Sequence, residues 1–347
     1  MSKSDYTIQP LALDEITTYP LATRKGKVSI SGFAKPVLSS SLGKFLDSLP
    51  NILAAQDLRA LLAAIHAAKR RRKAILWGLG GHVIKTGLGP ILADLMRRGF
   101  VSGIALNGAA LIHDFEIALS GQTSEDVEAS LGEGKFGMAT ETGFFLNQIA
   151  GNAAFSQIGY GEAAGKFLAS QTHRLKPENA AASILYTAYR LKIPITIHLA
   201  IGTDVHHMHP AADGAALGAA THHDFRLFCS LVKEMHPGGL YLNWGSAVLL
   251  PEIFLKAVSV VRNLGIALQP ITTANFDFIQ HYRPLQNVVK RPTAAVKGRT
   301  STSKGYAITG HHELLLPVVA AALVSNWPAA ESRLRTSPKK KVVARQK

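Results

Sequence analysis

Short apolar runs alternate with segments of helical periodicity along most of this chain. In the first half, apolar runs at 75–79 (ILWGL) and 101–107 (VSGIALN) alternate with helix-period segments at 88–98 and 113–119. The later half repeats the rhythm, with apolar runs at 195–202, 239–245 and 266–272 and helix-period segments at 224–235 and 250–264. Near-continuous apolar strands that alternate with helices are typical of a parallel sheet covered on both faces. The pattern therefore predicts an α/β fold.

The same pattern divides the chain into three parts. We expect residues 1–35 to form an irregular or extended N-terminal arm, 36–328 to form one large α/β domain, and 329–347 to be a disordered basic tail. Within the domain, 122–190 is rich in alanine and glycine and is expected to be mostly helical, whereas 286–304 is expected to be a polar, basic loop.

Composition excludes several classes of protein. The chain has 347 residues, of which 47% are apolar and 18% charged, too apolar for a disordered protein. Its single cysteine, Cys229, excludes an intrachain disulfide and any cysteine-built metal site. The N-terminus lacks the apolar core of a signal peptide, and the longest apolar run near the C-terminus, 314–324, is too short to span a bilayer. We therefore expect a cytoplasmic protein with no membrane partner.

The formal net charge of +15 is concentrated in three segments. Residues 331–347 carry +6, Lys69–Lys73 carry +5 and 290–304 carry +5, which leaves −1 for the rest of the chain. A basic tail can hold RNA or another polyanion in a salt-dependent way, but no aromatic residues are interleaved with it. We therefore expect a solvated tail and no nucleic-acid partner apart from that tail.

Six segments rich in Gly, Thr, Asp, Asn and His lie beside the expected strands, and ligands of open parallel sheets bind beyond the carboxyl ends of strands. The first, Gly78–Pro90, is rich in glycine but lacks the GxGxxG spacing and the later acidic residue of a standard dinucleotide fingerprint. The others are 107–116, 202–218, 238–248, 271–277 and 309–313. So many polar segments favour an enzyme or a tight small-molecule binder over packing alone.

Histidines and carboxylates gather after the apolar run 195–202. Imidazole and carboxylate ligands suit zinc, manganese or iron, so a metal-dependent hydrolase is one alternative. Its ligands would come from Asp204, His206, His207, His209 and His311. The spacing matches no complete metallohydrolase signature, and clustered imidazoles often orient a substrate or transfer protons instead. We therefore expect no metal.

Taken in order, these motifs resemble the deoxyhypusine synthase family over about residues 37–325. The matching pieces are Ser39-Ser40-Ser41-Leu42-Gly43, Gly80-Gly81 with Ile84-Lys85, Ile193-Pro194, Asp213-Gly214-Ala215-Ala216-Leu217-Gly218, Gly245-Ser246-Ala247-Val248, Thr273-Ala274, Arg283-Pro284 and Leu316-Pro317. The run from Gly81 through Glu116 also resembles the C-terminal domain of the bifunctional arginine dihydrolase/ornithine cyclodeaminase proteins. Both resemblances imply a Rossmann-like, doubly wound fold that binds NAD. The first also implies a homotetramer or homodimer.

The sequence departs from the deoxyhypusine synthases at the residue that carries their chemistry. In that family a lysine forms a covalent imine with the aminobutyl group. Alignment of Gly245-Ser246-Ala247-Val248 with the family's glycine-rich turn places Leu250 at the position of this lysine, and Lys256 lies six residues further on. The motifs that bind the cofactor in the family are similar in this sequence, whereas the lysine that transfers the amine group is replaced. The resemblance therefore implies a divergent member that does not make deoxyhypusine.

We therefore expect an NAD-dependent transferase, oxidoreductase or cyclodeaminase-like enzyme that acts on a small amine or amino acid, through an imine that is not bound to a lysine. The resemblance places the cofactor against Ser40, Gly80, Gly81, Asp213, Gly214, Gly245, Ser246, Thr273 and Ala274. We expect Asp204, His206, His207, His113 and His311 to be the groups that handle protons, because histidine titrates near neutral pH. This assignment requires His113, His206 and His311 to face one cavity. The third class that the sequence leaves open is a non-catalytic NAD- or nucleotide-binding protein.

Overall fold

The computed structural model describes residues 45–46, 48–132, 134–295 and 301–325. Its centre is a six-stranded sheet in which every neighbouring pair of strands is parallel, in the order β3-β2-β1-β4-β5-β6. The strands are β1 (Ile75–Leu79), β2 (Gly103–Asn107), β3 (Ile195–His198), β4 (Leu240–Trp244), β5 (Thr272–Asp277) and β6 (Lys304–Thr309). The predicted α/β class is confirmed, and the sheet is Rossmann-like and doubly wound.

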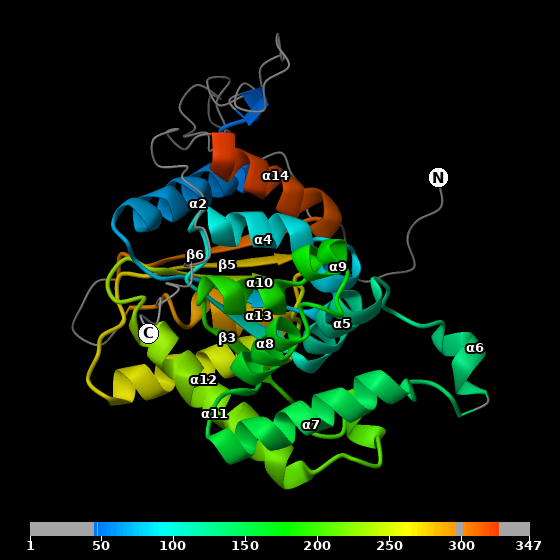
Figure 1. Cartoon of the computed structure of the whole chain (residues 1–347). Helices are drawn as coiled ribbons and strands as arrows, with labels where there is room; N and C mark the ends of the chain where they lie inside the picture. Colours follow the sequence, from blue (N-terminus) through cyan, green and yellow to red (C-terminus); the bar gives the residue numbers. More distant parts are fainter. Residues whose placement is uncertain (1–44, 47, 133, 296–300, 326–347) are drawn as a thin grey trace, which may run out of the picture.

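Helices cover both faces of the sheet. In Figure 1, α2 (Leu53–Arg70), α4 (Gly89–Arg97) and α14 (His312–Ser325) lie above it, and α11 (Gly214–Lys233) and α12 (Leu249–Asn263) lie below it. The other helices are α3 (Gly81–Lys85), α5 (Gly108–Ser120), α6 (Val127–Leu131), α7 (Thr140–Ser156), α8 (Tyr160–Ser170), α9 (Pro177–Ala182), α10 (Ile184–Leu191), the 3-10 turn η3 (Val205–Met208), α13 (Tyr282–Pro284) and the π-helix η4 (Leu285–Lys290). The segment predicted to be mostly helical, 122–190, therefore holds α6 to α10.

Alternate residues of β1, β2 and β4 enter two separate cores. On β4, Leu240, Leu242 and Trp244 belong to the larger core, whereas Tyr241 packs in the smaller core with Phe254 of α12. Both faces are thus buried, which explains why the strands read as continuous apolar runs. In the larger core, Trp244 stacks on Phe276 of β5 at 3.8 Å between ring centroids.

The fifth strand lies later in the chain than the pattern predicts. Residues 266–271 of the apolar run form a loop whose Leu268 and Ile271 are buried in the smaller core, and Pro270 has no N–H to donate to a ladder. The strand itself is the polar stretch Thr272–Asp277, which looked like a loop. Its polar side chains are buried and bonded, as when Thr273 Oγ1 donates to the carbonyl of Val288 at 2.6 Å. The residues of this loop are apolar because they are buried, and not because they pair in a strand.

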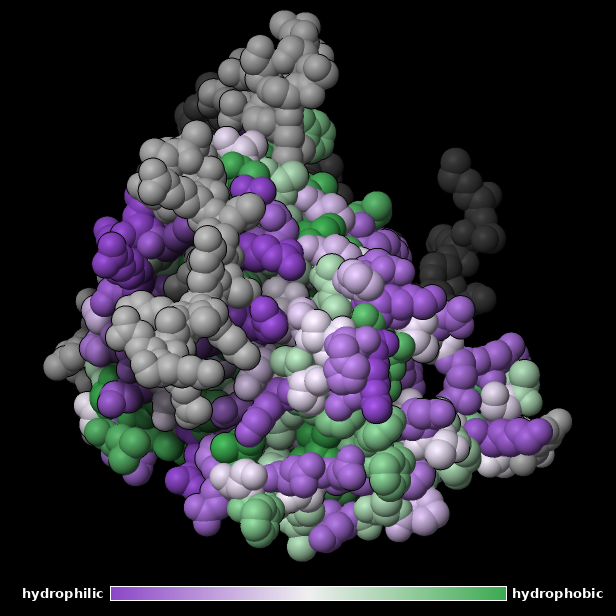
Figure 2. All heavy atoms as spheres, viewed as in Figure 1, coloured by the Kyte–Doolittle hydropathy of each residue, from purple (hydrophilic) through white to green (hydrophobic). Residues whose placement is uncertain are grey.

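The expected loop 286–304 is also partly regular, because it begins within η4 and ends at the first residue of β6. The basic cluster Lys69–Lys73 lies where α2 ends, and Arg70, Arg71 and Arg72 are exposed. Figure 2 shows hydrophilic side chains gathered at this end of α2, at the upper left of the molecule. Cations are favoured at a helix C-terminus. Among the described helices, none is long and apolar enough to cross a membrane.

Candidate functional site

The turns after β1 and β4 meet at the centre of the carboxyl edge of the sheet. The two strands are neighbours, but the chain proceeds from β1 toward β3 on one side and from β4 toward β6 on the other. The Gly80 N–H donates to the carbonyl of Trp244 at 2.9 Å, and a Cβ on Gly80 would overlap the carbonyl oxygen of Gly245. Gly245 has φ of +64°, a conformation that favours glycine. This is the topological switch point, where ligands of such sheets bind.

A cavity of about 510 Å³ lies beside the switch point, beyond the ends of β1, β2 and β3. Its lining includes three carboxylates but one lysine, Lys85, so its charge is net negative. Gly81 lies behind its wall, because a Cβ there would be 2.8 Å from Cβ of Ala109 and 3.3 Å from Cδ2 of His113. The lining residues are Lys85, Ala109, Ile112, His113, Glu116, Gln122, Thr123, Ser124, Glu125, Val127, Phe136, Ala139, Thr203, Asp204 and Val205.

Three lining side chains form a hydrogen-bonded chain. The Thr123 hydroxyl donates to Glu116 Oε2 at 2.6 Å, so its oxygen is left to accept from Nδ1 of His113 at 2.7 Å. Thr142 donates to the other oxygen of Glu116 at 3.0 Å. Neutral His113 thereby carries its proton on Nδ1 and has a lone pair on Nε2. Burial lowers the pKa of His113, and the Glu116 carboxylate opposes that shift.

Asp204 also lines the cavity, where its carboxylate packs against Gly108 at the start of α5. A side chain on Gly108 would displace this carboxylate. Burial raises the pKa of Asp204 to about 6. At neutral pH this carboxyl group is therefore mostly ionised, although it sits close to its titration point.

The structure does not bring all of the predicted proton-handling groups together. His206 does not line the cavity; it is fully buried and its ring lies 6.3 Å from that of Tyr160. Nδ1 of His207 accepts from the backbone N–H groups of Gly202 and Asp204. His311 is exposed, and its ring lies 5.9 Å from Phe278 on the β4–β6 half of the edge. The prediction that His113, His206 and His311 face one cavity is therefore wrong. Of the five predicted proton-handling residues, only His113 and Asp204 line it.

Four of the predicted cofactor residues lie away from the switch point. Asp213 caps α11 by accepting from the N–H groups of Ala215 and Ala216, which fixes its carboxylate on the helix, and Gly214 is the first residue of that helix. Thr273 and Ala274 lie near the start of β5 and are fully buried, so they are not at a strand end as expected. Gly80, Gly81, Gly245 and Ser246 do lie at the switch point, and Ser40 falls outside the described residues.

Leu250, at the position of the family's imine-forming lysine, is buried in the smaller core. Its N–H donates to the hydroxyl of Ser246 at 3.2 Å at the start of α12. Lys256 is exposed and pairs with Glu252 on the same helix, so it does not replace the missing amine.

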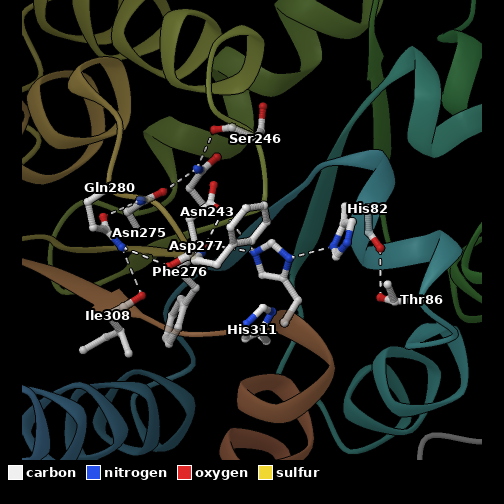
Figure 3. Close-up of polar contacts among 12 residues, drawn as sticks. His82, Thr86, Asn243, Ser246, Asn275, Phe276, Asp277, Gln280, Ile308 and His311 are labelled. Carbon is white, nitrogen blue, oxygen red and sulfur yellow. Dashed lines mark hydrogen bonds and ion pairs between the residues drawn. The ribbon is translucent and has the colours of Figure 1, made fainter.

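A second polar cluster, which sequence reasoning did not assign, occupies the β4–β6 half of the carboxyl edge (Figure 3). Asn243 Nδ2 donates to Asn275 Oδ1 at 2.7 Å and to the carbonyl of Ser246, and Asn275 donates to Gln280 Oε1. Asn243 is fully buried, and its Oδ1 has no hydrogen-bond partner within the described ranges. Beside it, Nδ1 of His82 and Nδ1 of His312 are 3.1 Å apart. The only sequence signal for this pair was the adjacency of each histidine to a glycine-containing turn.

The alternative of a metal centre has no geometric support in the part of the chain that the structure describes. No group of three or more histidine, cysteine, aspartate or glutamate side chains there is arranged to hold a metal ion. His206 and Asp204 face different surroundings, as described above, although they are two residues apart.

No protein-family model matches the chain, and no curated protein matches it in sequence. Similar solved structures include a Methanococcus maripaludis S2 protein provisionally described as a LOR/SDH protein, with 17% identity, a TM-score of 0.46, and coverage of 79% of this chain and 70% of that one. A protein from Entamoeba histolytica provisionally described as a deoxyhypusine synthase has 11% identity and a TM-score of 0.45, over 83% and 94% of the two chains.

The ternary complex of AgrE with ornithine and NAD+ has 15% identity and a TM-score of 0.48. The match covers 79% of this chain and 34% of AgrE, and the same 34% holds for the cyanobacterial arginine dihydrolase ArgZ, so the chain spans about a third of those proteins. Both families that the sequence resembles are thus among the similar structures. At these identities and scores, the likeness carries no activity over to this chain.

Proposed function

We propose that this protein is an NAD-dependent enzyme that oxidises a small amine or amino acid to an imine. The observation that carries the proposal is the net negative cavity at the switch point of a parallel sheet, with the Glu116–Thr123–His113 chain in its wall. A cationic substrate is favoured by such a lining, and a histidine with a free lone pair can take its proton.

The strand order supports a dinucleotide cofactor. The order 3-2-1-4-5-6 is that of the dinucleotide-binding doubly wound sheet, in which the ligand lies across the switch point. Gly80, Gly81, Gly245 and Ser246 would hold NAD there, and the unpartnered Oδ1 of Asn243 is a buried acceptor suited to an amide N–H. Asn107, the last residue of β2, caps α5 and is not acidic, so it does not itself supply a carboxylate for a ribose. When bound, NAD would supply a hydride acceptor.

The cavity accounts for the class of substrate. Glu116, Glu125 and Asp204 favour an ammonium group, and Lys85 can pair with the carboxylate of an amino acid. Nε2 of His113 would accept the proton of the ammonium group, because only a neutral amine can release a hydride from its carbon. With Leu250 in place of the lysine, the imine formed would remain free in the site.

Binding of NAD+ tests the cofactor half of this proposal. We expect heat of binding and a rise in the melting temperature at millimolar NAD+, since a ligand that binds the folded state stabilises it. No heat and no change in melting would remove the NAD assignment. Binding of NAD+ without NADH formation from any of a panel of monoamines, diamines and amino acids would favour the non-catalytic alternative.

Asp204→Asn tests the substrate half. We expect the apparent affinity for the amine to fall about tenfold, because one charge in the cavity is lost. In the wild type, affinity should also weaken as the pH falls below about 6, where Asp204 gains a proton, and the variant should lose this dependence. Glu128→Gln, which removes an exposed carboxylate outside the cavity lining, is the matched control. Equal effects of the two variants would contradict the assignment of the cavity.

The assembly implied by the resemblance stays a prediction. We propose a homotetramer or homodimer, and light scattering coupled to size-exclusion chromatography would measure the mass of the particle. A monomer over the micromolar range would exclude both states.

A further inference from the structure

Lysine and arginine side chains gather at the edge of the sheet opposite the cavity. All strands of a parallel sheet begin at the same edge, here called the amino edge, which lies on the left in Figure 1. Arg71, Arg72 and Lys73 precede β1, Lys192 precedes β3, and Lys304 is the first residue of β6. These five residues, which we call the amino-edge cations, come from segments that are far apart in the sequence.

Backbone hydrogen bonds hold the starts of the strands beside one another. The N–H of Leu240 donates to the carbonyl of Ala74 at 2.9 Å, which joins the start of β4 to the segment before β1. The N–H of Lys304 donates to the carbonyl of Ile271 at 3.1 Å, which joins the start of β6 to the segment before β5. Neighbouring strands lie about 4.8 Å apart, so the starts of β1 and β6, three strands apart, are separated by about 14 Å. Two of the three basic segments of the chain therefore lie along one edge.

Helix dipoles account for only part of this charge. The helices α2, α4, α10, α11 and α12 end at the amino edge, and each has a cation in its last turn. A helix C-terminus favours such a cation, but the effect falls off within the last turn. Arg71 and Lys192 cap α2 and α10 and belong to this class. Arg72, Lys73 and Lys304 lie beyond it, so the helices do not explain them.

Carboxylates do not neutralise the amino edge. The segments that join these five helices to the next strand, all of them described, contain one carboxylate, that of Glu234. The amino-edge cations form no ion pair with any residue of the described ranges. Four of them are exposed, and Cγ of the half-buried Lys73 lies 3.9 Å from the position of a Cβ on Gly238. The cavity at the carboxyl edge is net negative, so the two edges carry opposite charge.

We propose that the amino edge binds the phosphate backbone of a double-stranded nucleic acid. The inference is independent of the proposed function, because the cavity lies at the other edge of the sheet. Six strands give an edge about 24 Å long, and a duplex presents one phosphate charge per about 1.7 Å of its axis, so about 14 phosphates face a surface of this length. Guanidinium groups bind phosphate in a bidentate way, and ammonium groups bind it as point charges. The sequence alone predicted no nucleic-acid partner for the body of the chain, because it does not show that separate basic segments share one edge.

The composition of the edge favours a duplex over a single strand. Proteins that bind single strands stack the bases on aromatic side chains. None of the segments that join the five helices to a strand presents an exposed aromatic ring, since Phe100, before β2, is buried. The edge consists of loops and helix ends, so it has no helix or ribbon that would enter the major groove and read bases. We therefore expect binding that depends on phosphates and not on base sequence.

Fluorescence anisotropy of a labelled DNA duplex tests this surface in the full-length protein. The duplex has about 20 base pairs and, at 3.4 Å per pair, is longer than the edge. The variant Arg71→Gln/Lys304→Gln removes one cation from each of two segments that only the fold brings to one edge. We expect the slope of log K against log salt to fall by about 1.8, because each lost phosphate contact removes about 0.9. An RNA duplex should also lose affinity, since it presents the same phosphates.

Arg174→Gln/Lys176→Gln is the matched control, which also removes one arginine and one lysine from exposed positions. These residues follow α8, which begins beside Ile195 at the amino edge and leads away from it over eleven residues. The control should keep the slope of the wild type, and melting curves of both variants confirm folding. Equal losses of slope in the two variants would overturn the proposal. So would a single strand that binds as tightly as the duplex, or displacement of the duplex by polyglutamate at an equal concentration of charge.

Discussion

Asp204 caps the short 3-10 turn η3, which contains His206 and His207, yet each of the three residues has a different environment. A 3-10 helix turns by about 120° per residue, so the side chains of Asp204 and His206, two residues apart, point in different directions. His207 follows Asp204 by three residues and lies on the same side, where its ring bonds the backbone. Asp204 reaches the cavity, His207 accepts from backbone N–H groups, and His206 enters the core beside Tyr160. At the scale of the residue, Asp204 therefore lines the cavity, whereas His206 and His207 do not.

His206 makes stability depend on pH. Burial lowers its pKa to about 3, against 6.5 for an ordinary histidine, so the unfolded chain binds more protons between these values. The free energy of unfolding therefore falls as the pH drops below 6.5, because the unfolded chain takes up a proton that the buried ring does not. This loss amounts to about 2 kcal/mol at pH 5. From pH 7.5 to pH 5, the free energy of unfolding should fall by about 2 kcal/mol less in His206→Leu than in the wild type. Urea unfolding at the two pH values measures this difference.

The comparison between variant and wild type isolates His206. His198 is also buried with a pKa lowered to about 3, whereas burial raises the pKa of Asp224 to about 7 and so favours the folded state at low pH. These groups are present in both proteins and their contributions cancel in the difference. Identical slopes of stability against pH in the two proteins would show that His206 is accessible to protons in the folded state.

At the scale of the element, the turns after β1 and β4 are built on glycine because the backbones touch. Gly80 has φ of −82° and ψ of 164°, which any residue adopts, so its identity reflects space and not backbone strain. A methyl group there would overlap the carbonyl oxygen of Gly245. We expect Gly80→Ala to lower the free energy of unfolding by about 2 kcal/mol or more, as for overpacking of a core.

Gly218 provides the matched control for this substitution. It lies within α11, and a Cβ there would have no heavy atom within 4 Å. Gly218→Ala should be neutral or stabilise by about 0.5–1 kcal/mol, because alanine is the better helix former. Urea unfolding of both variants measures the difference. If Gly80→Ala were as well tolerated as Gly218→Ala, the contact between the two strand-end turns would be absent in solution.

At the scale of the whole molecule, charge is distributed unevenly. The C-terminal segment 331–347 holds +6 of the +15, and Lys69–Lys73 and 290–304 hold a further +5 each. Deletion of 331–347 leaves +9, and should weaken binding of a single-stranded RNA and reduce its salt dependence, because each lost phosphate contact lowers the slope by about 0.7. Fluorescence anisotropy at several salt concentrations measures this. An unchanged affinity and slope would show that the tail only adds solubility.

The sequence by itself determined the fold class and the positions of four strands. Strands β1 to β4 lie within the predicted apolar runs, because strands buried on both faces must be apolar at every position. It also indicated His113, Asp204 and the glycines at the ends of β1 and β4. Residues whose role follows from local chemistry, such as a glycine at a strand end, are readable without a structure.

Tertiary structure alone decided the rest. Strand β5 was hidden because the polar side chains of Thr273 and Asn275 find their partners on other segments, while the apolar loop before it is buried without pairing. The His82–His312 pair joins residues 230 positions apart, and the Glu116 carboxylate orients His113 through the Thr123 hydroxyl, which lies on the same wall of the cavity. Such contacts depend on how distant segments pack. A one-dimensional pattern records which residues are apolar, but not which polar groups meet.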